Sequence, residues 1–313
     1  MTGDRRGGDD PEPFGVLLMG YGSPSGPGGL PAYLAEVMHG RAPSAETVAD
    51  YTRRYARIGG TPQPRILAEL RERLERRLAR DRPGARVFLA TKHAAPRLSE
   101  VIPAAAREGF SALRAVALSP YASTWISEPY ASGIAEGIRA ADRPISVEFR
   151  NGWHLDPDWI GTWAEGIRRA LADEAERPGV VLLSAHSLPT RFRDRGDPYP
   201  RLVRATADAV ARAAGLARWE FTYQSPGNTT EPWLGPEIGE VMRAWKERGA
   251  TRQLVAATGF VFDHLETLYD LDVVVREEAE AAGIHYRRVP MPNAAPGVVE
   301  ALARRLLGPA TGP

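Results

Sequence analysis

Short apolar runs alternate with longer amphipathic segments along almost the whole chain. The runs have the length of strands and are rich in Val, Leu, Ala and Phe. Four lie in the first half, at 14–22, 85–93, 113–120 and 145–153, and four in the second, at 180–187, 219–225, 252–260 and 285–290. Strands separated by helices are typical of parallel sheets, so the pattern predicts an α/β protein with two similar lobes, each a four-stranded parallel sheet flanked by helices.

Several of the segments between the strands have helical periodicity. The segment 64–80 carries one apolar stripe, and Arg and Glu fill most of its other positions. The stripe consists of Ile66, Leu67, Leu70, Leu74 and Leu78. Segments 156–175 and 199–214 have the same character. We therefore expect amphipathic helices that cover the sheets and expose a charged face.

The pattern also suggests how the chain is divided. We expect a disordered tail over 1–13, an N-terminal lobe over 14–144, a C-terminal lobe over 145–308 and a short tail over 309–313. The first dozen residues are polar and rich in Gly, without the apolar segment of a signal peptide. No apolar run approaches the roughly 20 residues that span a bilayer. The sequence thus predicts a cytoplasmic protein without stable membrane insertion.

Composition excludes several classes of site and partner. The 313 residues include 40 Lys and Arg against 39 Asp and Glu, so the net charge of +1 gives no reason to expect nucleic acid as a partner. The chain has no cysteine, which excludes disulfides, thiolate zinc sites, Cys-ligated iron–sulfur clusters and cysteine nucleophiles. Any metal must therefore be bound by His, carboxylate, Tyr or Met. The common phosphate-loop, serine-hydrolase and zinc-protease motifs are also absent.

Polar residues follow many of the predicted strands. In parallel sheets, ligands bind beyond the carboxyl ends of the strands, where loops converge. In the first lobe these residues are Tyr21, Ser23, Lys92, His93, Tyr121, Ser123 and Thr124. In the second lobe they are His186, Ser187, 224–228, Asp263, His264 and Glu266. We expect the functional site among them.

One histidine and two carboxylates stand out. His186 ends the apolar run VVLLSAH, and a helix starting near Asp263 would place Glu266 and Asp270 on one face. The acidic pair could be a solvated helix face with Asp263 as its N-cap. It could equally attract a divalent cation and relay protons, with neutral His186 as nitrogen ligand or base. The spacing leaves both interpretations open.

Several long strings resemble those of ferrochelatases, most closely the Gram-positive coproporphyrin ferrochelatases. The second half contains SAHSLP (184–189), GDPYP (196–200), YQSPGNTTEPWLGP (223–236), GFVFDHLETLYDLD (259–272) and MPNAAP (291–296). The first half contains MGYGSP (19–24), RYARIGG (54–60), TKH (91–93) and SPYASTWISEPY (119–130). The strings follow the family's order from residue 14 to about residue 307, which makes the resemblance specific.

The resemblance implies a site in the cleft between the lobes. It implies His186 and Glu266 as the catalytic, metal-side pair, with Asp270 as a possible proton relay, and Tyr21 on the opposite face of the tetrapyrrole. The other residues that it implies as substrate contacts are Arg54, Tyr55, Ser123, Thr124 and Tyr130. On the remaining positions, we expect a structural role for His93 rather than cleft lining or an accessory cation site. We expect His264 to support the site from behind, since a helix would turn it away from Glu266.

The implied activity is insertion of Fe(II) into coproporphyrin III to give coprohaem, in haem biosynthesis. Porphyrin and ferrous iron are then the substrates and partners, and no redox cofactor or iron–sulfur cluster is needed. A monomer is expected, although the sequence carries no direct signal of oligomeric state.

Some positions differ from those of the family that the chain resembles: Met38 and His39 replace arginines, Pro62 lies where a Ser-Pro pair is usual, and Val274 replaces an acidic residue. Three alternatives therefore stay open: protoporphyrin IX as substrate, another divalent metal, or a non-catalytic protein that binds porphyrin or haem.

Overall fold

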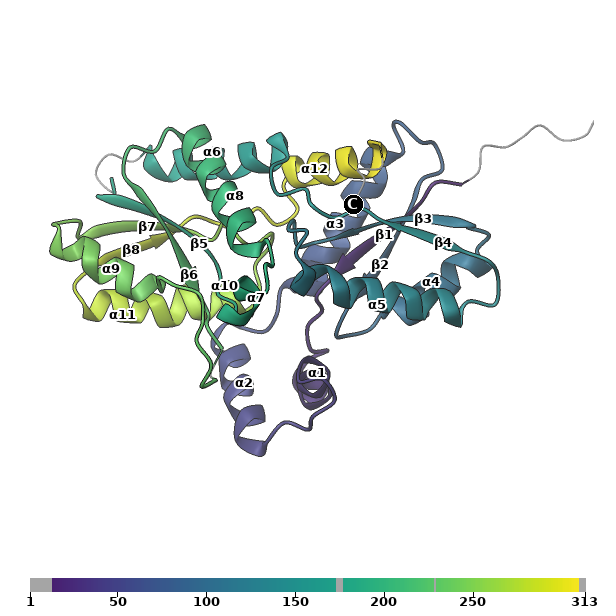
Figure 1. Ribbon diagram of the computed structural model, residues 1–313, viewed down its shortest axis with the longest axis horizontal. Helices are drawn as coiled ribbons and strands as arrows, with labels where there is room; N and C mark the ends of the chain where they lie inside the picture. The colour runs from purple at the N-terminus through teal and green to yellow at the C-terminus, as the bar shows by residue number, and fades with distance from the viewer. Residues whose placement is uncertain (1–12, 173–176, 228, 310–313) are drawn as a thin grey trace, which may run out of the picture.

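Two four-stranded parallel sheets form the framework of the protein (Figure 1). The computed structural model describes residues 13–172, 177–227 and 229–309, so residues 1–12 and 310–313 of the predicted tails lie outside the described residues. The first sheet has the order β2-β1-β3-β4, with β1 (Gly15–Gly20), β2 (Arg86–Thr91), β3 (Ala112–Ala117) and β4 (Ser146–Phe149). The second has the order β6-β5-β7-β8, with β5 (Val180–His186), β6 (Trp219–Gln224), β7 (Arg252–Ala256) and β8 (His285–Arg288). All eight predicted strands and the α/β class are confirmed.

Helices connect the strands and cover both sheets (Figure 1). They are α1 (Leu30–Val37), α2 (Ala45–Arg57), α3 (Gln63–Leu78), α4 (Leu98–Arg107), α5 (Thr124–Ala140), α6 (Pro157–Leu171), α7 (Thr190–Asp194), α8 (Tyr199–Ala214), α9 (Ile238–Glu247), α10 (Leu265–Leu268), α11 (Arg276–Ala281) and α12 (Pro296–Leu307). A short 3₁₀ helix, Pro27–Gly29, precedes α1, and a π-helical segment, Asp270–Val275, joins α10 to α11. The three helices predicted from periodicity correspond to α3, α6 and α8, although residues 173–175 of the second prediction lie outside the described ranges.

The predicted boundary between the lobes needs correction. β4 pairs with β3 in parallel, from Ala112 with Ser146 to Ala115 with Phe149, so it completes the first sheet rather than starting the second lobe. The last helix, α12, also returns to the first lobe. There Glu300 of α12 accepts hydrogen bonds from Arg77 at 2.8 Å. The strand pattern already groups 145–153 with the first half, so the boundary at 145 lies too early. The return of α12 depends on contacts between residues distant in sequence, which a boundary drawn by position cannot anticipate.

The lobes share one continuous apolar core. Buried side chains of the first sheet and α3, such as Leu18 and Leu70, belong to the same cluster as Leu182 and Val255 of the second sheet. Trp159 of α6 lies fully buried in this cluster. The shared core fixes the lobes relative to each other, and therefore fixes the residues that follow β1 relative to those that follow β5.

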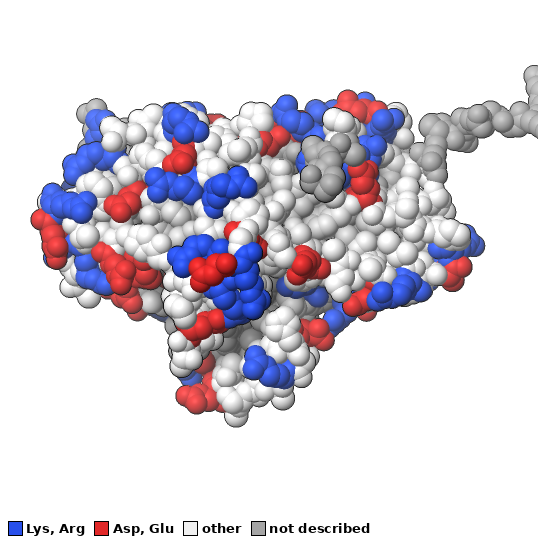
Figure 2. Space-filling view, in the orientation of Figure 1, with Lys and Arg blue, Asp and Glu red and all other residues white. Residues whose placement is uncertain are grey.

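The segment 30–57, here called the α1–α2 arm, projects from the body of the protein beneath the two sheets (Figure 1). α2 contributes no buried residue. Over the described ranges, none of the helices combines the length and the apolar character that a bilayer crossing requires. Figure 2 shows acidic and basic side chains interspersed over the face in view, without a continuous field of one sign.

Candidate functional site

His186 is delivered to the site by the end of the central strand β5. It is the last residue of the strand and pairs in register with Gln224 of β6. The Tyr199 hydroxyl donates a hydrogen bond to the His186 carbonyl at 2.9 Å, and the ring Nδ1 is hydrogen bonded to the carbonyl of Ser187. Nδ1 is therefore the donor, and Nε2 is the nitrogen left to face the site.

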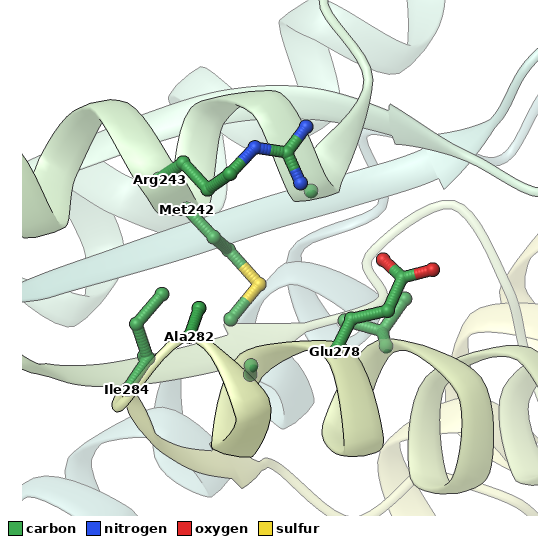
Figure 3. Close-up of a pocket in the computed structure, with 8 residues that line it drawn as sticks. Met242, Arg243, Glu278, Ala282 and Ile284 are labelled. Carbon is green, nitrogen blue, oxygen red and sulfur yellow. The ribbon is translucent and has the colours of Figure 1, made fainter.

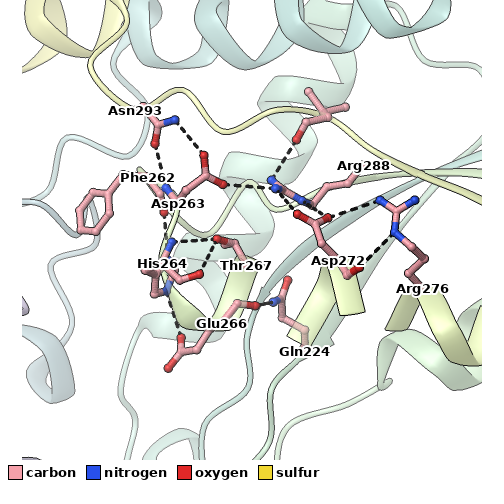
Figure 4. A network of polar contacts seen from close by, with 11 residues as sticks. Gln224, Phe262, Asp263, His264, Glu266, Thr267, Asp272, Arg276, Arg288 and Asn293 are labelled. Atoms are coloured by element: carbon pink, nitrogen blue, oxygen red, sulfur yellow. Dashed lines mark hydrogen bonds and ion pairs between the residues drawn. The ribbon is translucent and has the colours of Figure 1, made fainter. Parts of the chain in front are cut away.

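Glu266 approaches from the loop and helix after β7. Its Oε1 lies 3.5 Å from Nε2 of His186. Its Oε2 lies 3.3 Å from Nε2 of His264 (Figure 4). The carboxylate thus lies between two imidazoles. Behind it, the buried side-chain amide of Gln224 donates to the Glu266 carbonyl at 3.0 Å. The two residues predicted as the metal-side pair are brought together, and Gln224 is a supporting residue whose role was not predicted from the sequence.

The start of the Glu266 helix differs from the prediction. α10 begins at Leu265, and its N-cap is His264, not Asp263. His264 has an extended backbone, with φ −154°, so the helical angle that was expected to turn its ring away from Glu266 does not apply. The ring instead contacts the carboxylate directly, while its Nδ1 is 2.9 Å from the carbonyl of Phe262.

The electrostatics of the pair place a proton on His186. Burial by itself lowers the pKa of His186, but the Glu266 carboxylate, the Ser187 carbonyl and Asp270 outweigh it and raise the pKa to about 9. Burial by itself raises the pKa of Glu266, but His186 and His264 outweigh it and hold that pKa well below its usual range. At neutral pH the pair is therefore an imidazolium beside a carboxylate. A cation can bind to Nε2 only after this proton leaves.

Asp270 lies close to the same pair. Burial raises its pKa, and the neighbouring Glu266 carboxylate adds to the increase, while a hydrogen bond with Ser225 and the charges of Arg54 and His186 oppose it. A carboxyl group with a raised pKa accepts protons more readily than an ordinary aspartate. The structure thus places Asp270 near His186 and Glu266, while its role as a relay stays a prediction.

Tyr21 faces the pair from the first lobe. Its ring packs on His93 with centroids 4.6 Å apart, and Nζ of Lys92 lies 5.4 Å from its centroid. The side chain is 43% exposed, yet burial raises its pKa, as do Glu266 and Tyr130. The influence of Glu266 places these two side chains near each other across the boundary between the lobes, at what is here called the inter-lobe site.

The expected structural role of His93 agrees with its surroundings. The residue is buried, with 7% exposure, and its ring packs against Tyr21. Burial and the nearby charges of Lys92 and His39 lower its pKa to about 4, so the imidazole is neutral at physiological pH. The neutral His93 ring therefore supports the Tyr21 ring by packing against it.

The α1–α2 arm brings Arg54 and Tyr55 close to the inter-lobe site, since Arg54 contacts Tyr269 and Glu266 contributes to the raised pKa of Tyr55. Nε of Arg54 donates to Asp50 at 2.7 Å, and its guanidinium lies over the rings of Tyr51 and Tyr269, at 5.2 and 5.3 Å from their centroids. Tyr269 belongs to the Glu266 segment, so Arg54 connects the arm to the second lobe. The neighbouring residues Asp50 and Tyr51 are additional candidates, and their helical spacing from Arg54 and Tyr55 is the signal that could have revealed them.

The three residues predicted on α5 differ in accessibility. Thr124, the first residue of the helix, is exposed. Ser123 is the N-cap, with 1% exposure, and its hydroxyl accepts a hydrogen bond from the Ile126 amide at 3.3 Å. Tyr130 is buried and packs near Phe149, although its charge would influence Tyr21. The influence on Tyr21 places Tyr130 near the inter-lobe site, whereas the Ser123 hydroxyl is occupied by its own helix.

The positions expected to depart from the family pattern lie on the arm, at the start of α3 and on the Glu266 segment. Pro62 is the N-cap of α3. Met38 is the C-cap of α1, and the exposed His39 follows it in a left-handed conformation, with φ 57°. Val274 lies in the π-helical segment with 36% exposure.

Among the described residues, no group of three or more His, Asp or Glu side chains is arranged to hold a metal ion. His186 and Glu266 supply two donors, which suits a cation that is passed on to another ligand rather than one held permanently. A cavity between α9 and α11, lined by residues that include Met242 and Ile284, measures only about 10 Å³ (Figure 3). It has room for no more than about one water molecule, so it is not a competing ligand site.

Comparisons with known proteins find relatives that match almost the whole chain. A family model described as Ferrochelatase matches residues 13–307. The coproporphyrin III ferrochelatase of Anoxybacillus flavithermus is 35% identical over 301 residues, covering 94% of this chain and 95% of the relative. That of Geobacillus kaustophilus is 35% identical over 300 residues, with the same coverage of 94% and 95%.

Solved structures share the fold at low sequence identity. The sirohydrochlorin chelatase SirB from Bacillus subtilis subspecies spizizenii, in complex with cobalt, superimposes with a TM-score of 0.58 at 12% identity, covering 94% of each chain. CbiX, described as the terminal enzyme of sirohaem biosynthesis in denitrifying bacteria, gives a TM-score of 0.57 at 17% identity, covering 93% of this chain and 97% of CbiX. The two-lobed architecture is thus shared with these chelatases.

Proposed function

The chain belongs to the ferrochelatase family, and we propose that it inserts Fe(II) into coproporphyrin III to give coprohaem during haem synthesis. The observation that carries the proposal is the His186 and Glu266 pair, 3.5 Å apart, whose carboxylate lies near enough to Tyr21 of the first lobe to raise the pKa of that tyrosine. The names of the curated relatives support coproporphyrin III as the porphyrin.

The reaction exchanges two protons for one metal ion. Iron forms bonds to the four pyrrole nitrogens, and the two pyrrole N–H bonds break. A catalyst therefore needs weak ligands that hold and release the cation, a group that accepts protons, and a shaped cleft. Iron stays ferrous throughout, so the proposed reaction needs neither a redox cofactor nor an iron–sulfur cluster.

His186 and Glu266 fit the metal-side roles. Fe(II) that binds to Nε2 of His186 displaces its proton, while the ionised Glu266 supplies a negative oxygen ligand. Once His186 is deprotonated, it or the carboxylate can accept a pyrrole proton as the metal moves into the macrocycle. Asp270, whose pKa is raised by burial, can pass that proton outward.

The groups that would hold the porphyrin lie mainly on the first lobe and the arm. In the proposal, Tyr21 lies against the face of the macrocycle opposite the pair, with Tyr55, Thr124 and Tyr130 along the walls. Arg54 is the proposed partner of a propionate, since guanidinium binds carboxylates through paired hydrogen bonds. Its present partner Asp50 competes for that role.

An anaerobic steady-state assay with Fe(II) tests the proposal, comparing coproporphyrin III with protoporphyrin IX. Faster turnover of coproporphyrin III is expected. Preference for protoporphyrin IX would overturn the substrate assignment, and absence of metalloporphyrin with Fe(II), Zn(II) and Co(II) alike would overturn the proposed activity.

The His186→Ala variant tests the assigned roles. Metal insertion should fall by at least about 100-fold, the usual contribution of a positioned acid or base, while porphyrin affinity measured by fluorescence stays the same. His285→Gln, at an exposed position of β8, serves as the matched histidine control and should retain full activity. Retention of activity by His186→Ala would remove this histidine from the mechanism.

A further inference from the structure

One arginine holds both ends of the segment that carries Glu266. Arg288, the last residue of β8, has a side chain that is only 8% exposed. Its guanidinium donates to both carboxylate oxygens of Asp272, at 2.7 and 2.6 Å, and to Asp263 at 3.2 Å (Figure 4). Asp263 precedes Glu266 and Asp272 follows it, so Arg288 closes this segment into a loop.

Other polar groups complete the network around the two aspartates. The Asn293 amide donates to Asp263 at 2.9 Å, and the Asp263 amide nitrogen donates back to the Asn293 side chain at 2.8 Å. On the far side, Nε of Arg276 donates to the Asp272 carbonyl at 3.1 Å. The buried charge of Arg288 is therefore balanced and hydrogen bonded, the condition under which a buried ion pair is tolerated.

The segment between the aspartates is irregular and needs such support. His264 is extended, α10 is only four residues long, and a π-helical stretch starts at Asp270. Val273 and Val274 both direct their amides to the Tyr269 carbonyl, at 3.1 and 3.0 Å. π-helical turns are rare and occur mostly where the surrounding structure holds them, often at functional sites.

We propose that Arg288 is a positioning residue for the metal step, which fixes the Glu266 carboxylate opposite His186 by clamping Asp263 and Asp272. This inference rests on the proposed function. Arg288 is not placed to contact iron or porphyrin; it acts through the backbone of the segment. The planar fork of the guanidinium allows it to bind both aspartates at once, which a lysine ammonium cannot reproduce.

The experiment compares Arg288→Lys with Arg287→Lys in the anaerobic Fe(II) assay. Arg287 is the preceding residue of the same strand, and its guanidinium reaches the Ala170 carbonyl at 3.4 Å instead of the aspartates. For Arg288→Lys we expect kcat/KM for Fe(II) to fall by about tenfold or more, the usual effect of losing an outer partner of a metal ligand. The dissociation constant for porphyrin should stay unchanged, and Arg287→Lys should match the wild type.

A double-mutant cycle separates positioning from a general loss of structure. In a Glu266→Gln background, Arg288→Lys should reduce the remaining rate no further, because its effect passes through Glu266. Asp272→Asn provides a second variant that weakens the clamp without leaving two buried carboxylates unpaired. It should lower kcat/KM for Fe(II) in the same direction.

Three results would overturn the inference: wild-type kinetics for Arg288→Lys, equal losses for Arg287→Lys, or a reduction in the Glu266→Gln background as large as in the wild type. An inactive wild type would instead overturn the proposed function, so the two failures are distinguishable.

Discussion

Nε2 of His186 and Oε1 of Glu266 lie 3.5 Å apart, although they reach the site from the ends of two different strands of the second sheet. β5 and β7 are adjacent and parallel, so their carboxyl ends meet at the same edge. Glu266 raises the pKa of His186, and His186 lowers the pKa of Glu266, so the proton of the pair lies on the histidine.

Removal of the Glu266 charge should release that proton. In Glu266→Gln, burial becomes the dominant influence on His186, and its pKa should fall from about 9 to near or below the ordinary 6.5. Titration of the histidine ring protons by NMR measures the change. The control variant His264→Asn keeps the Glu266 carboxylate, so the pKa of His186 should stay well above 6.5. A pKa near 9 in Glu266→Gln would show that Glu266 does not cause the raised pKa of His186.

The kcat/KM for the metal should increase with pH. The pKa of His186 is raised to about 9, so only a small fraction of the imidazole is free at neutral pH, and this fraction grows about tenfold per pH unit below 9. We expect kcat/KM for the metal to rise accordingly between about pH 6.5 and 8.5, while porphyrin affinity changes little. A flat profile over that range would contradict control by His186, and His186→Ala should lack the rise.

The free energy of unfolding should fall as the pH rises, because the protonated form of His186 is stabilised in the folded protein. The folded pKa of about 9 exceeds the ordinary 6.5, so the stabilisation is fully present below about pH 6.5 and is lost as the pH rises through 9. Urea unfolding at several pH values should therefore show a free energy of unfolding that decreases over this interval. In Glu266→Gln the decrease should disappear; a persistent decrease would assign it to other groups.

A glycine behind the pair should be intolerant of substitution. A Cβ on Gly259 would lie 2.6 Å from Cα of Ala185, the residue before His186, so Gly259→Ala must displace the end of β5. We expect a loss of about 1–3 kcal/mol in the free energy of unfolding, as for overpacking elsewhere, together with reduced metal insertion. Thermal unfolding and the Fe(II) assay measure both.

Gly161→Ala provides the control for that prediction. Gly161 lies in α6, and a Cβ there would meet no atom within 4 Å. Because Ala favours helix over Gly by about 1 kcal/mol, this variant should be as stable as the wild type or more stable, with full activity. Equal behaviour of the two variants would show that the close contact at Ala185 has no consequence.

The arm offers a test of the propionate partner. Asp50 accepts a hydrogen bond from Arg54 at 2.7 Å, and both side chains are about one-third exposed, so the pair is worth about 1 kcal/mol or less. Asp50→Asn should free Arg54 and lower KM for coproporphyrin III by up to about fivefold, whereas Arg54→Ala should raise it. Arg53 also pairs with Asp50 but is more exposed, so Arg53→Ala serves as the control. An unchanged KM in all three variants would exclude Arg54 as the partner of a propionate.

The sequence by itself determined the parts of this protein that follow from local pattern. Apolar runs predicted all eight strands, since a buried parallel strand requires a continuous apolar stretch. The ends of two such runs predicted that His186 and Glu266 would lie near each other, because parallel strands end at a common edge. Family-like strings around those residues added the chemistry.

Only the tertiary structure decided the contacts that depend on the path of the backbone between and across elements. A helical wheel turns His264 away from Glu266, but its extended backbone turns the ring toward it. α12 returns to the first lobe, where Glu300 meets Arg77, and β8 brings Arg288 to two aspartates on either side of Glu266. Such partners are distant in sequence and leave no periodic signal, so packing alone brings them together.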